Sequence, residues 1–297
     1  MKTLSIKELE MFSGIKAAAI RMWEHRYGFP APDRTATNIR YYSAEQLRRF
    51  LQVVALKQAG YRLCKLVRQE PALLDAMARK LKENSHLELL HLHQLIYYFC
   101  TGKLAAFDQE LDQATARLGI QSTLQQVIIP FLQKTELLSY QHKDYGTHYV
   151  VTAVRRKIIR AIESLPLATG GQQKPALLFL PEREHYDLIL LYAHYLLRKQ
   201  GFPVFYFGTD ITAENLGLMV QETDPGLLIT YQPSQSRHQR EVLKRLVQQT
   251  RTSARFFVIS GTPVATAEPA GDPLFANLSG LESAFRQLGA APQGAAS

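Results

Sequence analysis

Four arginines between residues 21 and 40 are the side chains of this sequence best suited to bind another molecule. Arg21 and Arg26 lie five residues apart in a segment with apolar periodicity, and Arg34 and Arg40 follow it closely. A guanidinium group can donate paired hydrogen bonds to the edge of a guanine or to a phosphate. Thr, Asn and Tyr residues that flank Arg34 and Arg40 add neutral donors suited to phosphates. The chemistry that this pattern favours is therefore nucleic-acid binding.

The positive charge of the chain is concentrated around these arginines. The whole sequence has a formal net charge of +9, and residues 1–70 alone contain 13 Lys and Arg against 6 Asp and Glu. A basic segment joined to a nearly neutral remainder is typical of a nucleic-acid-binding module attached to another module. The alternative is a basic surface that only faces solvent. We predict double-stranded DNA as the partner, and the candidate contact residues are Lys16, Arg21, Trp23, Arg26, Tyr27, Arg34, Thr35, Asn38, Arg40 and Tyr41.

Two short helices are predicted to position the first of these side chains. Residues 5–8 have the pattern of a capping box, in which a Ser hydroxyl and a Glu carboxylate satisfy free amides at a helix start. Gly14 ends this helix, and a second helix runs to about Tyr27. Two helices around a turn that contains Gly form a helix-turn-helix, whose second helix enters the major groove. Trp23 on that helix could pack inward or stack on a sugar, and the sequence leaves both roles open.

A β-hairpin, or wing, is predicted after the second helix. Pro30 and Pro32 cannot continue a helix because proline has no amide donor. Residues 34–42 contain several Thr and Tyr residues, which favour strands, around a turn at Asn38. A second capping box at residues 43–46 opens a helix that should end at a glycine, residue 60, and completes a winged helix-turn-helix.

The rest of the chain predicts a helical bundle and a parallel sheet. Residues 71–165 repeat apolar positions with a period of about 3.6, which is typical of helices. After a Gly- and Gln-containing linker, short apolar segments alternate with amphipathic helices, which indicates a Rossmann-like parallel sheet. The predicted fold is multi-domain, α plus α/β. Its domains are residues 1–70 (DNA binding), 71–168 (bundle), 174–265 (sheet) and 266–297 (C-terminal helix and flexible tail).

Several classes of protein are not expected from this composition. The sequence has no run of about 18 apolar residues, so we expect no membrane span. Charged residues near its start stand where a signal peptide would have its apolar stretch. Cys64 and Cys100 stand alone, so we expect neither a CxxC metal site nor a disulfide framework in a cytoplasmic protein. His91 and His93 face different sides of a helix and predict no metal site. Catalytic motifs such as a phosphate loop or a nucleophile elbow are missing, so we do not expect an enzyme.

The N-terminal motifs resemble those of the MerR family of winged helix-turn-helix transcriptional regulators. The resemblance covers residues 4 to about 69 and includes Leu4-Ser5-Ile6-Lys7-Glu8-Leu9, Gly14, Ile20-Arg21-x-Trp23-Glu24-x-Arg26-Tyr27, Pro30-x-Pro32-x-Arg34-Thr35 and Arg40-x-Tyr42-Ser43. It implies homodimers on inverted-repeat operators, with Arg21 and Arg26 in the recognition helix and Arg34, Arg40 and Tyr41 on the wing. Many members dimerise through a long C-terminal helix, in whose place this chain has the bundle.

The remainder is similar in its order of domains to the light-sensing, cobalamin-binding branch of that family. The resemblance implies that His185 would supply an imidazole to cobalt, and that the Ser260-Gly261-Thr262-Pro263 loop would pass the corrin tail. Arg183, however, replaces the acidic partner of the histidine, Leu188 replaces a glycine, and Leu138 replaces a tryptophan. The candidate cofactor residues are thus His185, Ser260 and Gly261. No bound cofactor is expected, with cobalamin as the alternative.

Taken together, these features predict a DNA-binding transcriptional regulator. It would act as a homo-oligomer, most simply a dimer, on inverted-repeat DNA, with a C-terminal sensor or interaction domain that responds to a small-molecule effector. The alternative is a cobalamin-binding regulator, responsive to light or ligand, or a cobalamin-dependent protein. In a third reading the Rossmann-like domain binds no ligand and serves only as an oligomerisation or protein-interaction surface.

Overall fold

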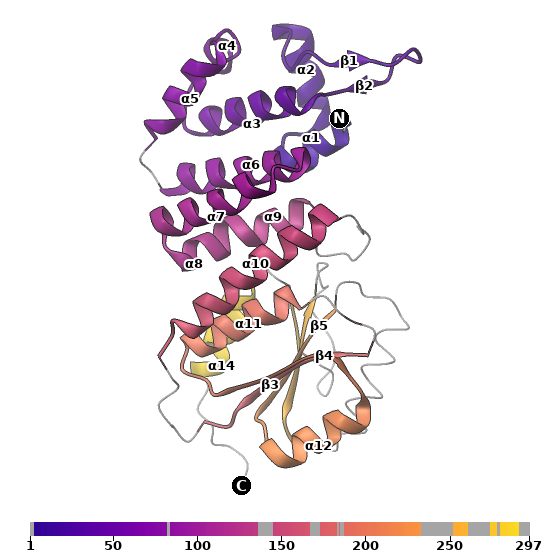
Figure 1. Ribbon diagram of the computed structural model, residues 1–297, viewed down its shortest axis with the longest axis vertical. Coiled ribbons are helices and arrows are strands. Elements are labelled where there is room, and N and C mark those ends of the chain that lie inside the picture. Colours follow the sequence, from indigo (N-terminus) through magenta and orange to yellow (C-terminus); the bar gives the residue numbers. More distant parts are fainter. Residues whose placement is uncertain are drawn as a thin grey trace. The chain divides into compact units, whose positions relative to one another are not determined.

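The computed structural model divides the chain into two compact units, residues 1–153 and 154–297 (Figure 1). It describes residues 3–81, 84–135, 145–166, 173–182, 184, 187–232, 252–260, 274–277 and 280–290. The predicted boundary at residue 70 falls inside the first unit. The four-part division of the sequence stays a prediction, and each unit is described below by itself.

The first unit begins with the helix-turn-helix. In α1 (Ile6–Ser13), the Ser5 hydroxyl accepts the amide of Glu8 while the Glu8 carboxylate accepts the amide of Ser5, so the predicted capping box is present. The helix ends at Gly14, whose φ of 76° lies in the left-handed region that favours glycine. The second helix, α2 (Ala17–Tyr27), follows directly. Both helices therefore lie where the sequence pattern predicts them.

A short wing and a long supporting helix complete this part of the unit. Strands β1 (Asp33–Arg34) and β2 (Arg40–Tyr41) pair antiparallel as the predicted hairpin. The second capping box, between Ser43 and Gln46, opens α3 (Ala44–Gln58). Its buried side chains include Phe50, which packs against the aromatic rings of residues 23 and 29.

The bundle follows and consists mainly of the predicted helices. They are α4 (Leu63–Leu66), α5 (Pro71–Arg79), α6 (Asn84–Thr101), α7 (Leu104–Leu118), α8 (Ile120–Ser122), a π-helical segment η1 (Thr123–Ile128), α9 (Ile129–Lys134) and α10 (Tyr145–Glu163). The residues of α10 from 154 onward belong to the second unit. The sequence predicts one helix over residues 121–138, whereas the structure divides residues 120–134 among α8, η1 and α9. The remainder of that prediction lies outside the described residues.

Helix α3 packs against both the DNA-binding elements and the bundle. His93 of α6 is 4% exposed, and its Nδ1 lies 3.0 Å from the carbonyl oxygen of Leu51 on α3. Tyr97 of α6 donates its hydroxyl to Glu45 at the start of α3, over 2.7 Å. Lys134 of α9 donates to the carbonyl of Met11 on α1. These contacts across residue 70 explain why the helix-turn-helix and the bundle form a single compact unit.

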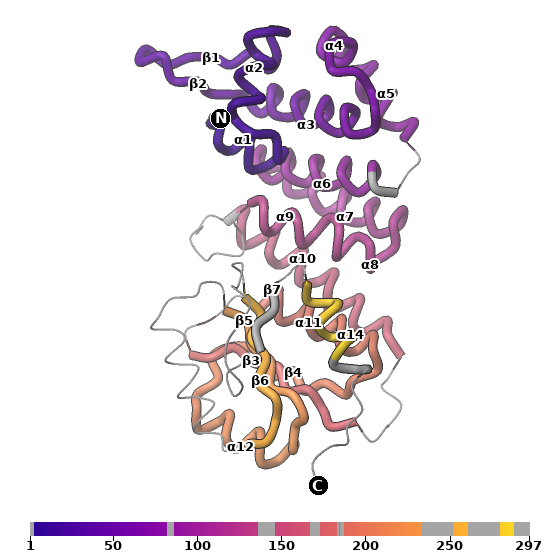
Figure 2. Tube along the Cα trace, turned by 180° about the vertical axis from the view of Figure 1, so that it is seen from behind, coloured from indigo at the N-terminus to yellow at the C-terminus, as the bar shows by residue number. Residues whose placement is uncertain are grey.

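The second unit contains a five-stranded parallel sheet in the order β4-β3-β5-β6-β7. Its elements are β3 (Ala176–Pro181), α11 (Leu188–Lys199), β4 (Val204–Ile211), α12 (Ala213–Thr223), β5 (Leu227–Gln232), β6 (Arg255–Ser260), β7 (Leu274–Asn277) and α14 (Leu281–Ala290). Helices α11 and α14 cover one face and α12 covers the other (Figures 1 and 2). This confirms the predicted α plus α/β fold with a Rossmann-like sheet.

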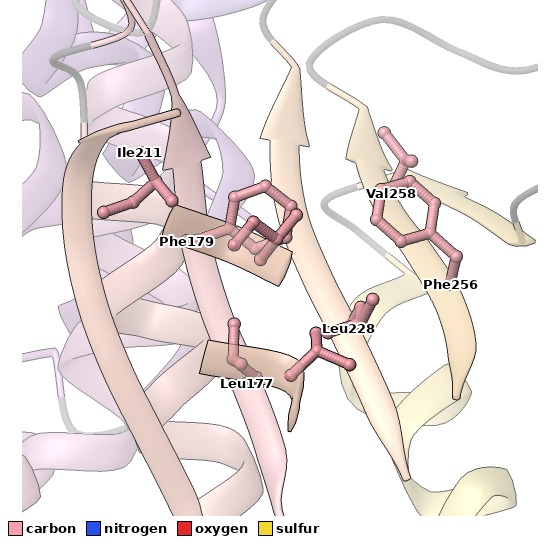
Figure 3. Packing of buried hydrophobic residues seen from close by; sticks show 8 residues of the cluster. Leu177, Phe179, Ile211, Leu228, Phe256 and Val258 are labelled. Atoms are coloured by element: carbon pink, nitrogen blue, oxygen red, sulfur yellow. The ribbon is translucent and has the colours of Figure 1, made fainter. Parts of the chain in front are cut away.

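The core of the sheet is built from the all-apolar strands that the sequence predicts. Leu177, Phe179, Leu228 and Val258 are all 0% exposed and project from neighbouring strands into one cluster (Figure 3). Leu216 of α12 covers this cluster. Apolar side chains on both faces are expected for a parallel strand that helices cover on both sides.

Two segments of this unit differ from the sequence prediction or lie beyond the description. The sequence predicts only a helix and a flexible tail after residue 265, but β7 adds a fifth strand to the sheet and α14 contacts α11. A helix predicted over residues 239–249 lies outside the described residues. The C-terminal segment therefore contributes to the sheet domain and is not a separate appendage.

Candidate nucleic-acid interface and sheet crevice

Helix α2 has one buried face and one exposed basic face. Ile20 and Trp23 are 0% and 5% exposed, and the Trp23 ring lies 6.1 Å from the ring of Phe50. Arg21 and Arg26 are exposed. The structure thus places the two predicted base-reading arginines on solvent. The side chain of Trp23 packs in the core against α3, and a contact between Trp23 and DNA stays a prediction.

Glu24 connects the wing to α2 through two ion pairs. Its carboxylate lies 3.0 Å from Nη2 of Arg34 and 2.8 Å from Nε of Arg40, and Nη1 of Arg34 donates to Asn38 over 2.8 Å. The hydrogen bond with Glu24 raises the pKa of the Arg40 guanidinium. The two wing arginines thereby fix the wing beside the recognition helix and retain N–H groups that can reach phosphates. The sequence analysis names Glu24 only as part of a motif and assigns it no role, although it is the only acidic residue between residues 11 and 32.

The other predicted contact residues lie around the same surface. Thr35 accepts the amide of Ile39 in the wing turn, and Asn38 has a φ of 63°, which this residue type tolerates. Lys16 is exposed and pairs with Glu10 at 3.1 Å. The guanidinium of residue 26 lies 5.4 Å from the centre of the Tyr27 ring, and Tyr41 is half-buried on β2. Figures 1 and 2 show the wing projecting beside α2.

A second basic segment lies at the same end of the unit. Arg62, Lys65 and Arg68 are exposed on and around α4, next to Tyr61, which is 40% exposed. In both views α4 lies at the end of the unit that carries α2 (Figures 1 and 2). The sequence analysis did not single out these residues, although their spacing of three would have placed them on one side of a helix. They extend the candidate interface beyond the recognition helix and the wing.

Polar side chains lie at the carboxyl ends of β5 and β6, the edge at which doubly wound sheets have their ligand crevice. Thr230, Tyr231 and Gln232 are buried. No described residue hydrogen-bonds to Oγ1 of Thr230, to the phenolic oxygen of Tyr231 or to Oε1 of Gln232. Gln232 pairs in register with Ser260, which is 1% exposed at the end of β6. In the order β4-β3-β5-β6-β7, neighbouring connections leave in opposite directions between β3 and β5, so the carboxyl end of β5 borders the point where ligands of doubly wound sheets bind. Thr230 and Gln232 project from the same face of β5, and their side-chain oxygens, which have no hydrogen-bond partner among the described residues, fit the polar part of a ligand.

The structure tests the predicted cofactor residues only in part. His185 and Gly261 lie outside the described residues, while Ser260 lies at this edge of the sheet. Leu188, in the position where the resemblance implies glycine, is 0% exposed at the start of α11. Its side chain is therefore part of the core and does not leave the open backbone that a glycine would provide.

A network next to this turn holds α10 and α11 together. Asp187 Oδ1 accepts from Arg155 of α10 at 2.7 and 3.1 Å, and Oδ2 accepts the Tyr206 hydroxyl at 3.0 Å. His194 stacks on the Tyr206 ring, and burial lowers the pKa of this histidine to about 4. Both carboxylate oxygens of Asp187 are thus occupied by side chains of the protein.

Residues 4–69 match the family model described as MerR HTH family regulatory protein. This segment is therefore similar to the MerR-type helix-turn-helix. The similarity to known proteins continues beyond this domain. The chain is 27% identical over 228 residues to the HTH-type transcriptional repressor CarA of Myxococcus xanthus. The aligned region covers 74% of this chain and 73% of CarA. It is 25% identical over 236 residues to the repressor CarH of the same organism, covering 75% and 77% of the two chains.

Solved structures with detectable similarity are distant. The methanol:cobalamin methyltransferase complex MtaBC from Methanosarcina barkeri aligns with 13% identity and a TM-score of 0.35, over 80% of this chain and 89% of that chain. The monomethylamine corrinoid protein of the same organism aligns with 14% identity and a TM-score of 0.42, over 67% and 98%. Among the helices that the structure describes, none has the length and apolar character needed to cross a membrane.

Proposed function

We propose that the protein is a DNA-binding transcriptional regulator with a C-terminal sensor or interaction domain of the cobalamin-binding type. The observation that carries the proposal is the MerR-type domain, whose second helix presents Arg21 and Arg26 to solvent beside a wing fixed by Glu24. The similarity to two transcriptional repressors over about three quarters of the chain supports the same function. No catalytic step is part of this proposal.

In the proposed complex, the helix and the wing contact different parts of the DNA. Helix α2 is the element that would enter the major groove, where arginine side chains can bind guanine edges. The wing and the basic residues around α4 would contact phosphates, which set affinity and register but carry no sequence information. Because one helix-turn-helix contacts only a half-site, we propose that the protein acts as a homodimer on inverted repeats. The bundle or the sheet domain would supply the dimer contact.

The experiment that tests this function selects DNA sites with the full-length protein from a random duplex library. The full chain is needed because α3 packs on α6, so a fragment ending at residue 70 would lose buried contacts. We expect an inverted-repeat site, a complex with the mass of a protein dimer by light scattering, and affinity that falls with salt concentration. Failure to enrich any site, together with DNA binding that does not depend on salt, would contradict the proposal.

Cobalamin is the second candidate element of the function, and the described residues fit it only in part. The side-chain oxygens of Thr230 and Gln232, which have no hydrogen-bond partner in the described part of the chain, suit a polar ligand group at this edge of the sheet. The buried Leu188 occupies the turn that a ligand tail would have to pass, and the sequence places Arg183 where an acidic residue would orient His185. We therefore propose that the domain keeps the architecture of a cobalamin domain but binds cobalamin weakly.

Titration of the full-length protein with adenosylcobalamin and methylcobalamin, followed by absorbance, should show no micromolar complex. The Arg183→Asp variant should bind more tightly, by about 10-fold, because it restores an acidic partner for the His185 imidazole. The His185→Ala variant supplies the control, since it should remove any gain. A micromolar or tighter complex of the unmodified protein that is abolished by His185→Ala would show that this reading of the site is wrong.

A further inference from the structure

The first unit contains a cavity that neither the DNA-binding surface nor the sheet crevice explains. Its volume is about 350 Å³, and its walls come from α3, α5, α6 and α7. Pockets for small molecules commonly have volumes of about 300–1,000 Å³. Helix α3, which forms one wall, also supports the recognition helix through the contact between Phe50 and Trp23. The cavity is therefore placed where a bound molecule could act on the DNA-binding elements.

The charged groups of the lining leave an excess of positive charge. Asp75 accepts from Arg48 at 3.2 Å and also from Gln52, and the Glu110 carboxylate lies 2.6 Å from Nδ1 of His91. Both acidic side chains of the lining are thus already paired. Two further lining arginines, residues 79 and 117, are exposed and form no ion pair with any residue that the structure describes. Arginine forks match the two oxygens of a carboxylate, so these side chains favour an anion.

A second histidine of α6, His93, contributes neither charge nor a hydrogen bond to the cavity. His93 is 4% exposed, and burial next to Lys134 lowers its pKa to about 3, so the imidazole is neutral. Because Nδ1 faces the carbonyl oxygen of Leu51, the proton resides on Nδ1 and the lone pair on Nε2. Nε2 has no hydrogen-bond partner among the described residues. This nitrogen is itself fully buried, so it is closed to a ligand in the cavity.

The remaining walls suit a flat apolar body. Leu87, Leu90 and Tyr98 of α6 line the cavity together with the polar groups. Aliphatic and aromatic side chains pack well against the face of an aromatic ring. A planar ring that carries a carboxylate combines the two features of the lining.

We propose that this cavity binds a small aromatic carboxylate, whose carboxylate pairs with Arg79 and Arg117 and whose ring packs against the apolar wall formed by α6. Occupation would alter the packing of α3 on α6 and so change the affinity of the protein for DNA. The binding site is independent of the sheet crevice and of cobalamin. Ligand binding is measured without DNA, so failure of this inference can be told apart from failure of the proposed function.

The test uses the full-length protein and 4-hydroxybenzoate as the probe. We expect saturable binding by calorimetry with a Kd below about 1 mM. The fluorescence of Trp23, the only tryptophan of the chain, should change with the same Kd because its ring packs on α3. Arg117→Gln should weaken binding by about 10-fold or more, since it removes a charge-assisted hydrogen bond. Arg160→Gln is the matched control, because this exposed arginine of α10 does not line the cavity.

Three results would overturn the inference. The first is the absence of saturable binding of 4-hydroxybenzoate up to about 10 mM, a concentration at which even very weak sites fill. The second is equal affinity for the uncharged 4-hydroxybenzyl alcohol, because the arginines would then contribute nothing. The third is an equal loss of affinity in Arg117→Gln and Arg160→Gln. An exposed position was chosen for substitution so that the variant retains its fold.

Discussion

Replacing Arg21 and Arg26 together by alanine should lower the affinity of the full-length protein for its selected site by about 2–6 kcal/mol. Each side chain is exposed on the basic face of α2, and an arginine that reads a base contributes about 1–3 kcal/mol of discrimination. The two positions lie five residues apart, so their losses should be nearly additive. Fluorescence anisotropy with labelled operator and with scrambled duplex measures the change, and the loss should be far larger for the operator.

Two variants serve as comparisons for this result. Arg40→Ala should weaken operator and scrambled DNA about equally and reduce the salt slope by about one, because a phosphate contact carries no sequence information. Arg160→Ala removes an exposed arginine of α10 outside the candidate interface and should leave both affinities unchanged. If the double variant of Arg21 and Arg26 lost affinity for operator and for scrambled DNA equally, α2 would not be the element that reads bases.

Trp23→Ala should destabilise the first unit by about 3–5 kcal/mol, the range for truncation of a large buried aromatic side chain. The indole is 5% exposed and packs on Phe50, so its removal leaves a cavity between α2 and α3. Urea unfolding of the full-length protein, followed by circular dichroism, should show an earlier transition. Because the chain has two compact units, the transition of the second unit should stay where it is.

Trp23→Phe separates the packing role from a contact role. Phenylalanine keeps an aromatic ring against Phe50, so the free energy of unfolding should fall by only a fraction of the loss in Trp23→Ala. The affinity of the folded Trp23→Phe variant for operator DNA should stay within about 2-fold of the original protein, a difference of about 0.4 kcal/mol. A loss as large as that of Arg21→Ala, with the fold intact, would assign the indole to the DNA surface.

Local features of the sequence determined the helix-turn-helix and most of the secondary structure. The capping boxes at Ser5 and Ser43 involve residues three positions apart, so each pattern already contains both hydrogen-bond partners. Gly14 adopts the left-handed backbone that ends α1, and the all-apolar strands of the sheet are visible in the sequence as short continuous apolar runs. The basic face of α2 followed from helical periodicity for the same reason.

The features that the sequence did not reveal depend on partners far apart in the chain. Glu24 pairs with Arg34 and Arg40 only because the wing folds back beside α2, over separations of ten and sixteen residues. Helical periodicity could not decide which side of α2 Trp23 occupies, since that depends on the position of α3. Strand β7 is four residues long, too short to give a clear signal by itself, and is identified by its pairing with β6.

The sequence by itself thus determined the type of each module, the recognition helix, the wing and the basic surface, because short-range spacing and composition decide these properties. The tertiary structure alone decided which side chains became core, which arginines were held by Glu24 and where the cavity lies. That cavity combines residues of α3, α5, α6 and α7, so its charge and shape exist only after the helices pack. The physical reason is that helix caps and apolar periods are satisfied within a few residues, whereas buried polar pairs require surfaces that the folded chain brings together.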